Sequence, residues 1–355
     1  MEVFPAGAHR NRASAALEKT VQFLQKIGPA GLPLLNLLSL KVTSGTACTS
    51  DPCSSVRDAQ VASLAERNVT LPAHAQFYVD DIQDPHWVAC VVQEKDGLVH
   101  VTLGLAPLTF SRRLTDCLDT LEEAGVLNWS SEKLHFPCVP SEFGDDIVKR
   151  GELRGSQTFK NQLTEFAAVY AKRELDHRST RTRQDARNHD KCVLPDGYVL
   201  DRLNSADVPI IHKHWKYGGL VGAIGYITSM INEWPKLTCG IYRCTGEGDD
   251  DRDSVTVYVQ QSEPFLQAGS RRELVAWGMV KTYGAIGLLH TLENHRRRGF
   301  AGMIVDYLET AMRQNSLHLF AYVDIGNDTS AKVFDKAGFQ GVQDFKVLWL
   351  TFLPH

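Results

Sequence analysis

Apolar positions in the last third of the chain follow strand and helix periods in turn. An apolar run from Ile286 to Leu292 is typical of a strand. The segment from Phe300 to Asn315 spaces its apolar residues as one helical face, at positions 301, 304, 305, 308, 311 and 312. Leu317 to Ile325 has the composition of a buried strand. A short helix over Ser330 to Ala337 and a last strand over Lys346 to Leu353 complete the predicted order.

The first half of the chain mixes the same two patterns. Helices are predicted over Ser14 to Ile27, Ser111 to Glu123 and Phe159 to Arg173. Two apolar runs, His86 to Val92 and Leu98 to Leu105, flank an Asp-Gly pair, which indicates a β-hairpin. The first domain is therefore expected to be a mixed α and β unit.

A basic stretch separates this part from the rest. Residues 172–191 hold seven lysines and arginines without an apolar period, which is typical of an exposed linker. The elements predicted after it are a strand at Tyr198 to Leu200, helices near Ser205 to Lys216 and Val221 to Asn232, and strands over Leu237 to Tyr242 and Ser254 to Val259.

Length and composition agree with two domains. The chain has 355 residues, about twice an average domain, and 43% of them are apolar. We predict an N-terminal α/β domain over residues 1–173, a basic linker over 174–196 and a second domain over 197–355. The formal charge of −4 argues against a nucleic-acid partner. The eight cysteines form no C-x-x-C pair, so reduced thiols are expected.

Neither a membrane span nor a metal site is expected. The longest apolar candidate, Leu32 to Leu40, is interrupted by polar residues and a proline. An acidic cluster at 246–253 lacks the ligand spacing of a calcium loop and favours a solvated hairpin tip. His212 and His214 would lie on different faces of a helix, and Cys239 and Cys244 have no second pair.

A candidate anion site lies between the predicted strand and the helix that begins at Phe300. The sequence there has the form Arg-x-x-Gly-x-Ala, at Arg296, Arg297, Arg298, Gly299, Phe300 and Ala301. A strand that feeds a glycine-containing loop into a helix presents backbone N–H groups without intrahelical partners. Such a corner binds phosphate, and the glycine has no Cβ to keep an anion away. An ordinary basic helix start is the structural alternative.

A second motif follows one helix and one strand later. It is Asn327-x-x-Ser330-x-x-x-Phe334-x-Lys336-x-Gly338-Phe339. Together the two motifs resemble the GNAT superfamily of CoA-dependent N-acyltransferases. The resemblance implies an α/β (α+β) fold with a mixed, mostly antiparallel sheet splayed around CoA. It also implies acyl-CoA or acetyl-CoA as co-substrate, with the corner on the pyrophosphate, backbone groups near Leu289 and Thr291 on pantetheine, and Asn327, Ser330 and Phe334 on the other side.

Two further segments narrow the resemblance. Trp215-Lys216-Tyr217-Gly218-Gly219 with Glu233-Trp234-Pro235 is similar to a signature of the glycine N-acyltransferase-like branch, in which the glycine turn lines the acceptor pocket. Gly125-Val126-Leu127-Asn128-Trp129 is similar to the N-terminal domain of that branch. The glycine acyltransferases are mitochondrial, but Glu2 and Glu18 are unlike a transit segment, so we expect the cytoplasm, with mitochondria as the alternative.

The acid–base residues of the family are replaced. Ala285 stands where the branch has a glutamate base, and Phe334 where many members have a tyrosine acid. The remaining candidates for a base are His290, which titrates near neutral pH and is our choice, and Tyr283, Glu293, Tyr322 and Asp324. Two hypotheses follow: an acyl-CoA-dependent N-acyltransferase acting on a small amine or amino acid by direct attack, or an acyl-CoA-binding regulatory protein with little or no turnover.

Overall fold

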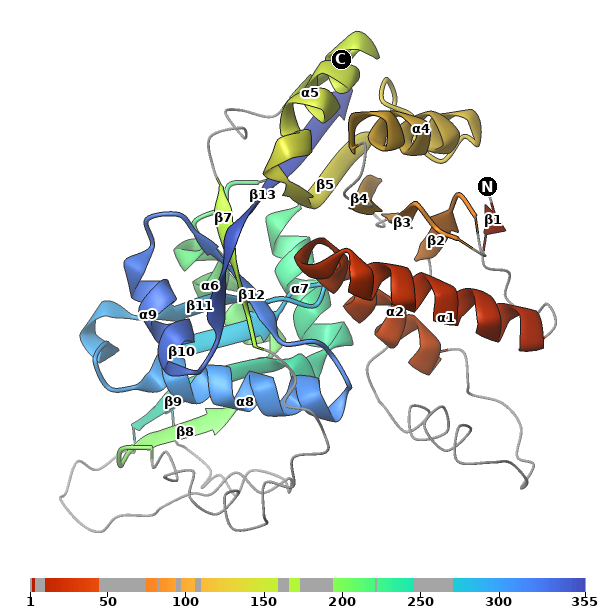
Figure 1. Ribbon diagram of the computed structural model, residues 1–355. Coiled ribbons are helices and arrows are strands. Elements are labelled where there is room, and N and C mark those ends of the chain that lie inside the picture. Colours follow the sequence, from red (N-terminus) through yellow and green to blue (C-terminus); the bar gives the residue numbers. More distant parts are fainter. Residues whose placement is uncertain are drawn as a thin grey trace.

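The chain is built around one sheet of 13 strands (Figure 1). The computed structural model describes residues 2–3, 10–44, 75–81, 84–93, 97–105, 110–158, 166–172, 194–220, 222–245 and 271–354. The strands are β1 (Glu2–Val3), β2 (Gln76–Val79), β3 (Trp87–Gln93), β4 (Leu98–Leu105), β5 (Lys133–Pro140), β6 (Ser156–Thr158), β7 (Ala167–Ala171), β8 (Tyr198–Asp201), β9 (Thr238–Thr245), β10 (Arg271–Val280), β11 (Ile286–Thr291), β12 (Phe320–Asp324) and β13 (Gln340–Pro354). The helices are α1 (Arg10–Lys26), α2 (Leu32–Ser44), α4 (Phe110–Glu123), α5 (Gly144–Leu153), α6 (Val208–His214), α7 (Ala223–Glu233), α8 (Phe300–Gln314) and α9 (Asp328–Lys336).

The sheet contains two parallel pairs, and both are short. β4 and β5 pair at residues 98–100 and 133–135, and β11 and β12 pair only at Ile286 and Ala321. The other strand pairs are antiparallel. The predicted fold class, a mixed and mostly antiparallel sheet that opens in the C-terminal half, is confirmed.

The two halves contain the same order of elements, strand–strand–helix–strand–helix, and they exchange strands. In the first half the order is β3, β4, α4, β5 and α5, and in the second it is β10, β11, α8, β12 and α9. β7, from the first half, pairs with β12 of the second, and the C-terminal strand β13 pairs with β5 and β6 of the first. Because each half completes its sheet with a strand from the other, the sheet runs through both predicted domains. The boundaries at 173 and 197 stay a prediction.

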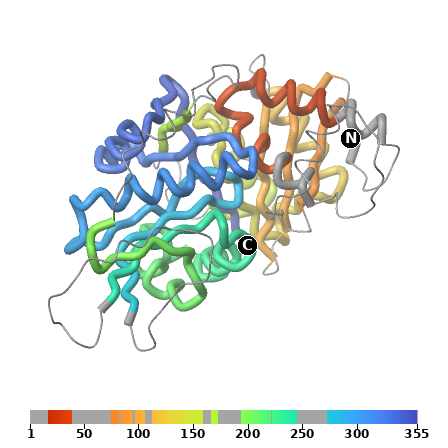
Figure 2. Tube along the Cα trace, turned by 90° about the horizontal axis from the view of Figure 1, so that it is seen from below, coloured from red at the N-terminus to blue at the C-terminus, as the bar shows by residue number. Residues whose placement is uncertain are grey.

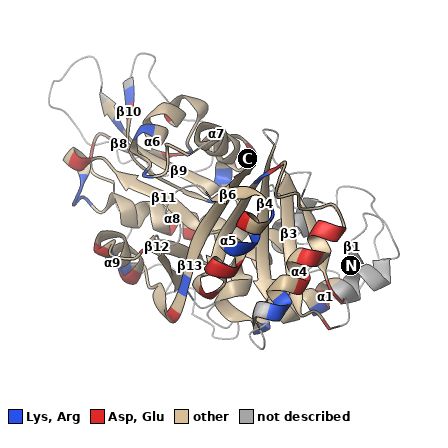
Figure 3. Ribbon diagram, turned by 90° about the horizontal axis from the view of Figure 1, so that it is seen from above, with Lys and Arg blue, Asp and Glu red and all other residues tan. Residues whose placement is uncertain are grey.

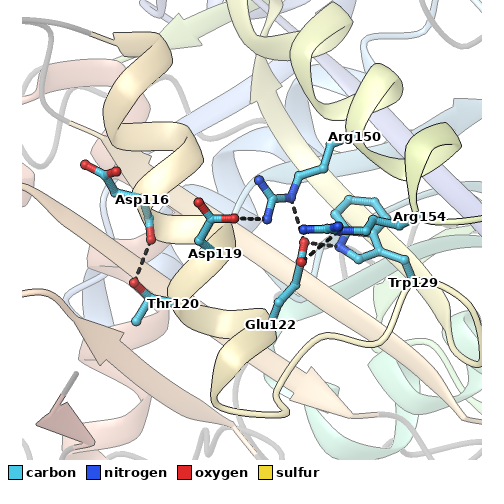
Figure 4. A network of polar contacts seen from close by, with 7 residues as sticks. All are labelled: Asp116, Asp119, Thr120, Glu122, Trp129, Arg150 and Arg154. Atoms are coloured by element: carbon cyan, nitrogen blue, oxygen red, sulfur yellow. Dashed lines mark hydrogen bonds and ion pairs between the residues drawn. The ribbon is translucent and has the colours of Figure 1, made fainter.

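The Gly125–Trp129 segment is fixed by a polar network in the first half (Figure 4). The indole N–H of Trp129 donates to Glu122 Oε1 at 2.7 Å, and Arg150 Nε donates to the same oxygen at 2.6 Å. Arg150 also pairs with Asp119, and Arg154 with Glu122. The arginines are neutralised by the carboxylates of α4, so this network ties α4 to α5 and explains the motif structurally.

The N-terminal helices join the two halves (Figure 2). Leu24 and Leu34 are fully buried in a core shared with Val275 and Ile286 of the C-terminal half. Asn36 of α2 is also fully buried. Its amide N–H groups donate to the carbonyls of Gly284 and His318, both at 3.0 Å, and its Oδ1 accepts from the His318 N–H at 2.7 Å. A helix from the start of the chain therefore holds the β10–β11 turn and the entry to β12.

Most predicted elements are present, with two corrections. Residues 167–171 of the predicted helix over Phe159–Arg173 form β7 instead, because Ala167 and Val169 alternate inward within the sheet. Several elements had no counterpart among the predicted ones: β10, although it is the partner of β9, and also α2, β2, β5 and α5. The strand predicted over Ser254–Val259, the acidic cluster and most of the basic linker lie outside the described residues. Within the described part, none of the helices has the length and apolar character of a membrane span.

Candidate active site at the splayed strands

The opening between β11 and β12 exposes one edge of β11. The Leu292 N–H donates to the Val275 carbonyl of β10 at 2.9 Å. Backbone groups alternate along a strand, so the N–H groups of Leu289 and Thr291 point the other way, toward β12. Beyond Ile286 the described β12 does not pair with β11. The predicted backbone groups at Leu289 and Thr291 are therefore on the open edge.

A bulge in β11 shapes this edge. Leu288 and Leu289 together face Gly278 of β10, and Leu288 has a φ of 47°. A Cβ at Gly278 would lie 2.7 Å from Ile304 of α8, so a larger residue there would push the helix away. A bulge turns a strand and interrupts its ladder. The glycine and the bulge thus let α8 pack closely behind β11 while the strand bends away from β12.

The Arg-x-x-Gly-x-Ala corner forms the N-terminus of α8. Gly299 precedes the helix with a φ of 81°, and Arg297 also has a positive φ, of 63°. The first hydrogen bond to this turn runs from the Met303 N–H to the Gly299 carbonyl at 3.2 Å, so the preceding N–H groups have no intrahelical partner. A Cβ at Gly299 would meet nothing closer than Met303 Cε at 4.0 Å, so the loop is open on that side.

The arginines of the corner are exposed and partly anchored. Arg296 Nε donates to the Thr291 carbonyl at 3.1 Å, which joins the loop to the open edge of β11. The Arg298 guanidinium lies 5.8 Å from the ring centre of Tyr198, whose hydroxyl is 3.0 Å from His295 Nδ1. Figure 3 shows blue lysine and arginine positions and red acidic positions on several elements of the described ribbon. The corner therefore combines free amides with accessible cations.

The second motif forms α9, which packs against α8. Asn327 caps α9 by accepting from the Ser330 N–H at 3.1 Å, and Gly338 ends it with a φ of 83°. Phe334 is 3% exposed and packs between Tyr170 and Phe339. The phenylalanine thus belongs to the hydrophobic core, whereas Asn327 and Ser330 are accessible at the start of the helix.

His290 lies on the open part of β11 in an aromatic stack. Its ring centre is 4.8 Å from that of Trp277 and 5.1 Å from that of His214. Burial lowers the pKa of His290 to about 4, and the nearby His214 and Arg296 act in the same direction. The imidazole is therefore neutral at pH 7, but it is a weak base.

The other candidate bases are less suited to neutral pH or already bound. Burial raises the pKa of Tyr283 and of Tyr322 well above the ordinary value. Asp324 accepts from Lys216 Nζ at 3.1 Å and lies 3.3 Å from the Tyr217 hydroxyl. Glu293 is exposed in the loop after β11. Ala285 is fully buried in the β10–β11 turn, so no carboxylate stands at that position.

The Trp215–Gly219 motif forms the turn between α6 and α7, opposite the end of β12. Trp215 stacks on Tyr226 with ring centres 6.0 Å apart, and the Lys216 and Tyr217 contacts to Asp324 tie the turn to β12. A Cβ at Gly218 would lie 2.6 Å from the His212 carbonyl, so only glycine fits there. The motif therefore closes one side of the opening between β11 and β12.

Sequence reasoning missed Lys281. It lies at the closed end of the opening, where Ile286 of β11 pairs with Ala321 of β12. Its side chain lies over Gly287, where an added Cβ would be 2.6 Å from Lys281 Cε. The Nζ atom is 5.5 Å from the ring centres of both Tyr283 and Trp349. A lysine after the end of a strand has no distinctive sequence pattern, so only the fold reveals it. No cluster of three or more potential metal ligands occurs in the described part of the chain.

Comparison with known protein families finds a match in the C-terminal half of the chain. Residues 266–350 match the family model described as FR47-like protein, and this range contains both motifs of the GNAT resemblance. In that range the chain is therefore similar to the FR47-like family of the GNAT superfamily. No curated protein sequence matches the chain.

Among solved structures, a Drosophila protein from a structural genomics consortium has a TM-score of 0.59 at 17% identity, covering 95% of this chain and 96% of its own. That likeness shows a fold shared with the Drosophila protein over nearly the whole chain. A GCN5-related N-acetyltransferase from Sphaerobacter thermophilus has a TM-score of 0.39 at 12% identity and covers 91% of each chain. A tandem GNAT protein from the clavulanic acid biosynthesis pathway has a TM-score of 0.39 at 14% identity, covering 92% of this chain and 95% of its own.

Proposed function

We propose that the chain is an acyl-CoA-dependent N-acyltransferase that moves an acyl group from a CoA thioester to a small amine or amino acid, with glycine as the model acceptor. The observation that carries the proposal is the corner at Arg296–Ala301 beside the open edge of β11. Free amides at a helix N-terminus favour a diphosphate, and the exposed arginines add charge. The FR47-like match over residues 266–350 supports the same assignment.

In this proposal the open edge of β11 holds the pantetheine arm and polarises the thioester. The N–H groups of Leu289 and Thr291 point into the opening, where they can donate to carbonyl oxygens of a bound thioester. Donors fixed in advance are effective because they need no reorganisation as negative charge develops. The amine attacks the carbonyl carbon, and the C–S bond breaks. A thiol with a pKa of about 8.5 leaves readily as thiolate, so the loss of the family tyrosine at Phe334 has little effect.

Asn327 and Ser330 at the start of α9 form the second side of the proposed cofactor site. Phe334 acts from the core, where it supports α9 rather than reaching the opening. His290 is the proposed acceptor of a hydrogen bond or proton from the amine. Its lowered pKa makes the first of these roles the easier one.

A second function is favoured by the missing acid–base groups. Ala285 and Phe334 are both buried, and neither can exchange a proton. A protein that kept the coenzyme corner and lost turnover would bind acyl-CoA as a regulatory signal. The two functions share the cofactor site and differ only in whether a thiol is released.

Free thiol release from acetyl-, benzoyl- and longer acyl-CoA with a panel of amines that includes glycine separates these functions. Release that depends on an amine is the expected result. Calorimetric binding of CoA without release from any pair would favour the regulatory function. Absence of both would remove the proposal altogether.

A further inference from the structure

The cation at the closed end of the opening has no counter-ion in the described part of the chain. Lys281 follows β10, and its N–H donates to the Ala285 carbonyl at 2.8 Å, which fixes the turn. No described carboxylate lies within 4.0 Å of its Nζ. Asp324 acts on it at longer range, but that carboxylate is already bound by Lys216. The two lysines and the aspartate leave one excess positive charge at this end.

Two aromatic rings lie against this cation. Tyr283 and Trp349 each lie 5.5 Å from Lys281 Nζ, and Tyr322 contacts both rings, at 6.0 and 5.4 Å between centres. Burial among these rings lowers the pKa of Lys281. Cation–π contacts leave the positive charge of the lysine uncompensated, whereas a charge-assisted hydrogen bond to a carboxylate would neutralise it.

Lys281 lies where the proposed substrate opening begins. Gly287, over which the lysine lies, directly follows Ile286, the last residue of β11 that pairs with β12. A glycine at this point lets the lysine stem lie flat on the strand. The open edge that begins there is the one that carries Leu289 and Thr291. A substrate in the opening would thus meet Lys281 at its inner end.

We propose that Lys281 binds a carboxylate group of a substrate at this inner end and so selects anionic substrates. The inference rests on the proposed acyl transfer, and the carboxylate belongs to either an amino-acid acceptor or a dicarboxylic acyl group. Lys281 would be a specificity-determining binding residue. Its Nζ donates to the carboxylate and takes no part in bond formation.

Two matched substrate pairs test the proposal with Lys281→Met, which keeps the stem and removes the charge. Glycine against glycinamide, with acetyl-CoA, reports an acceptor carboxylate. Succinyl-CoA against butyryl-CoA, with a neutral amine, reports an acyl carboxylate. We expect Lys281→Met to lower kcat/KM for the carboxylate member of one pair about tenfold to hundredfold, and to change the uncharged member less than about threefold. Lys346→Met, an exposed lysine on β13, is the control and should change neither ratio.

Equal loss for both members of both pairs would overturn the proposal. A pH profile that shifts in Lys281→Met for every acceptor would instead make the lysine a base, and would overturn it too. If no amine releases thiol, the proposed acyl transfer is refuted. Carboxylate binding at Lys281 is then tested separately, by measuring ligand binding. Calorimetry of N-acetylglycine against its amide, and of succinyl- against butyryl-CoA, then compares the wild type with Lys281→Met. A carboxylate preference that disappears in the variant supports the site, and no preference in the wild type refutes it.

Discussion

Replacing His290 by alanine should leave the pH dependence of acyl transfer unchanged. The neutral imidazole has a pKa of about 4. An alkyl ammonium has a pKa of about 10, so passing its proton to His290 is uphill by about six units, or about 8 kcal/mol. Binding the neutral amine directly from solution at pH 7 costs only about 4 kcal/mol, because about one molecule in a thousand is unprotonated. Binding the neutral amine therefore costs about half as much free energy as proton transfer to His290.

The assay is kcat/KM for amine-dependent thiol release between pH 4 and pH 9, a range that reaches the pKa of about 4 of His290. With the neutral amine as the reacting species, the logarithm of kcat/KM should rise with a slope of about one over this range in both wild type and His290→Ala. The variant loses the stacking contacts with Trp277 and His214, so a moderate and uniform loss of rate is expected.

His214→Ala is the matched control, because His214 lowers the pKa of His290. If His290 were the general base, removing His214 would raise the pKa of His290 and move the profile, while His290→Ala would abolish the inflection. Either change would refute the reasoning above. Parallel profiles for all three proteins would support it.

Three further predictions concern stability. Asn36→Ala leaves the Gly284 and His318 groups without their buried partner and should cost about 2–4 kcal/mol in denaturant unfolding, whereas a loss below about 1 kcal/mol would show that water replaces the amide. Gly218→Ala places a Cβ 2.6 Å from the His212 carbonyl and should lower Tm, while Gly219→Ala, with open space around it, should not; similar losses would contradict this account of the turn. The pKa of His290 in the folded protein lies below its unfolded value of 6.5, so protonation favours the unfolded chain as pH falls. The free energy of unfolding should therefore drop by about 1–3 kcal/mol between pH 6.5 and pH 4. His290→Ala should flatten this part of the plot of unfolding free energy against pH, and an unchanged plot would argue against the pKa shift.

The sequence predicted the parts of the fold that depend on local pattern. The helix that begins at Phe300, the strands on either side of it and the stop at Gly338 follow from periodicity and from glycine, which act within a few residues. The hairpin at β3 and β4 follows from its Asp-Gly pair for the same reason. These elements carry the corner, so the candidate coenzyme site could be located before the fold was known.

Contacts between residues far apart in the chain could not be predicted from local pattern. β7 was predicted as helix because its strand character comes from lying between β12 and β13, which are far away in the chain. The contacts of Asn36 with Gly284 and His318 join residues 248 and 282 positions apart, which no local pattern encodes. The low pKa of His290 likewise depends on Trp277, His214 and Arg296, which only the tertiary structure brings together.

Calorimetric titration of CoA into Gly299→Ala and Gly97→Ala tests the central claim most directly. Both glycines have nearly the same positive φ, 81° and 82°, and neither has a crowded Cβ position, so both substitutions carry a similar backbone strain of about 1–2 kcal/mol. Only Gly299 lies at the corner. The account predicts that wild type and Gly97→Ala bind CoA alike and that Gly299→Ala binds at least about tenfold more weakly, because its Cβ displaces the diphosphate from the amides. Equal affinity in both variants, or no heat with the wild type at millimolar CoA, would contradict it.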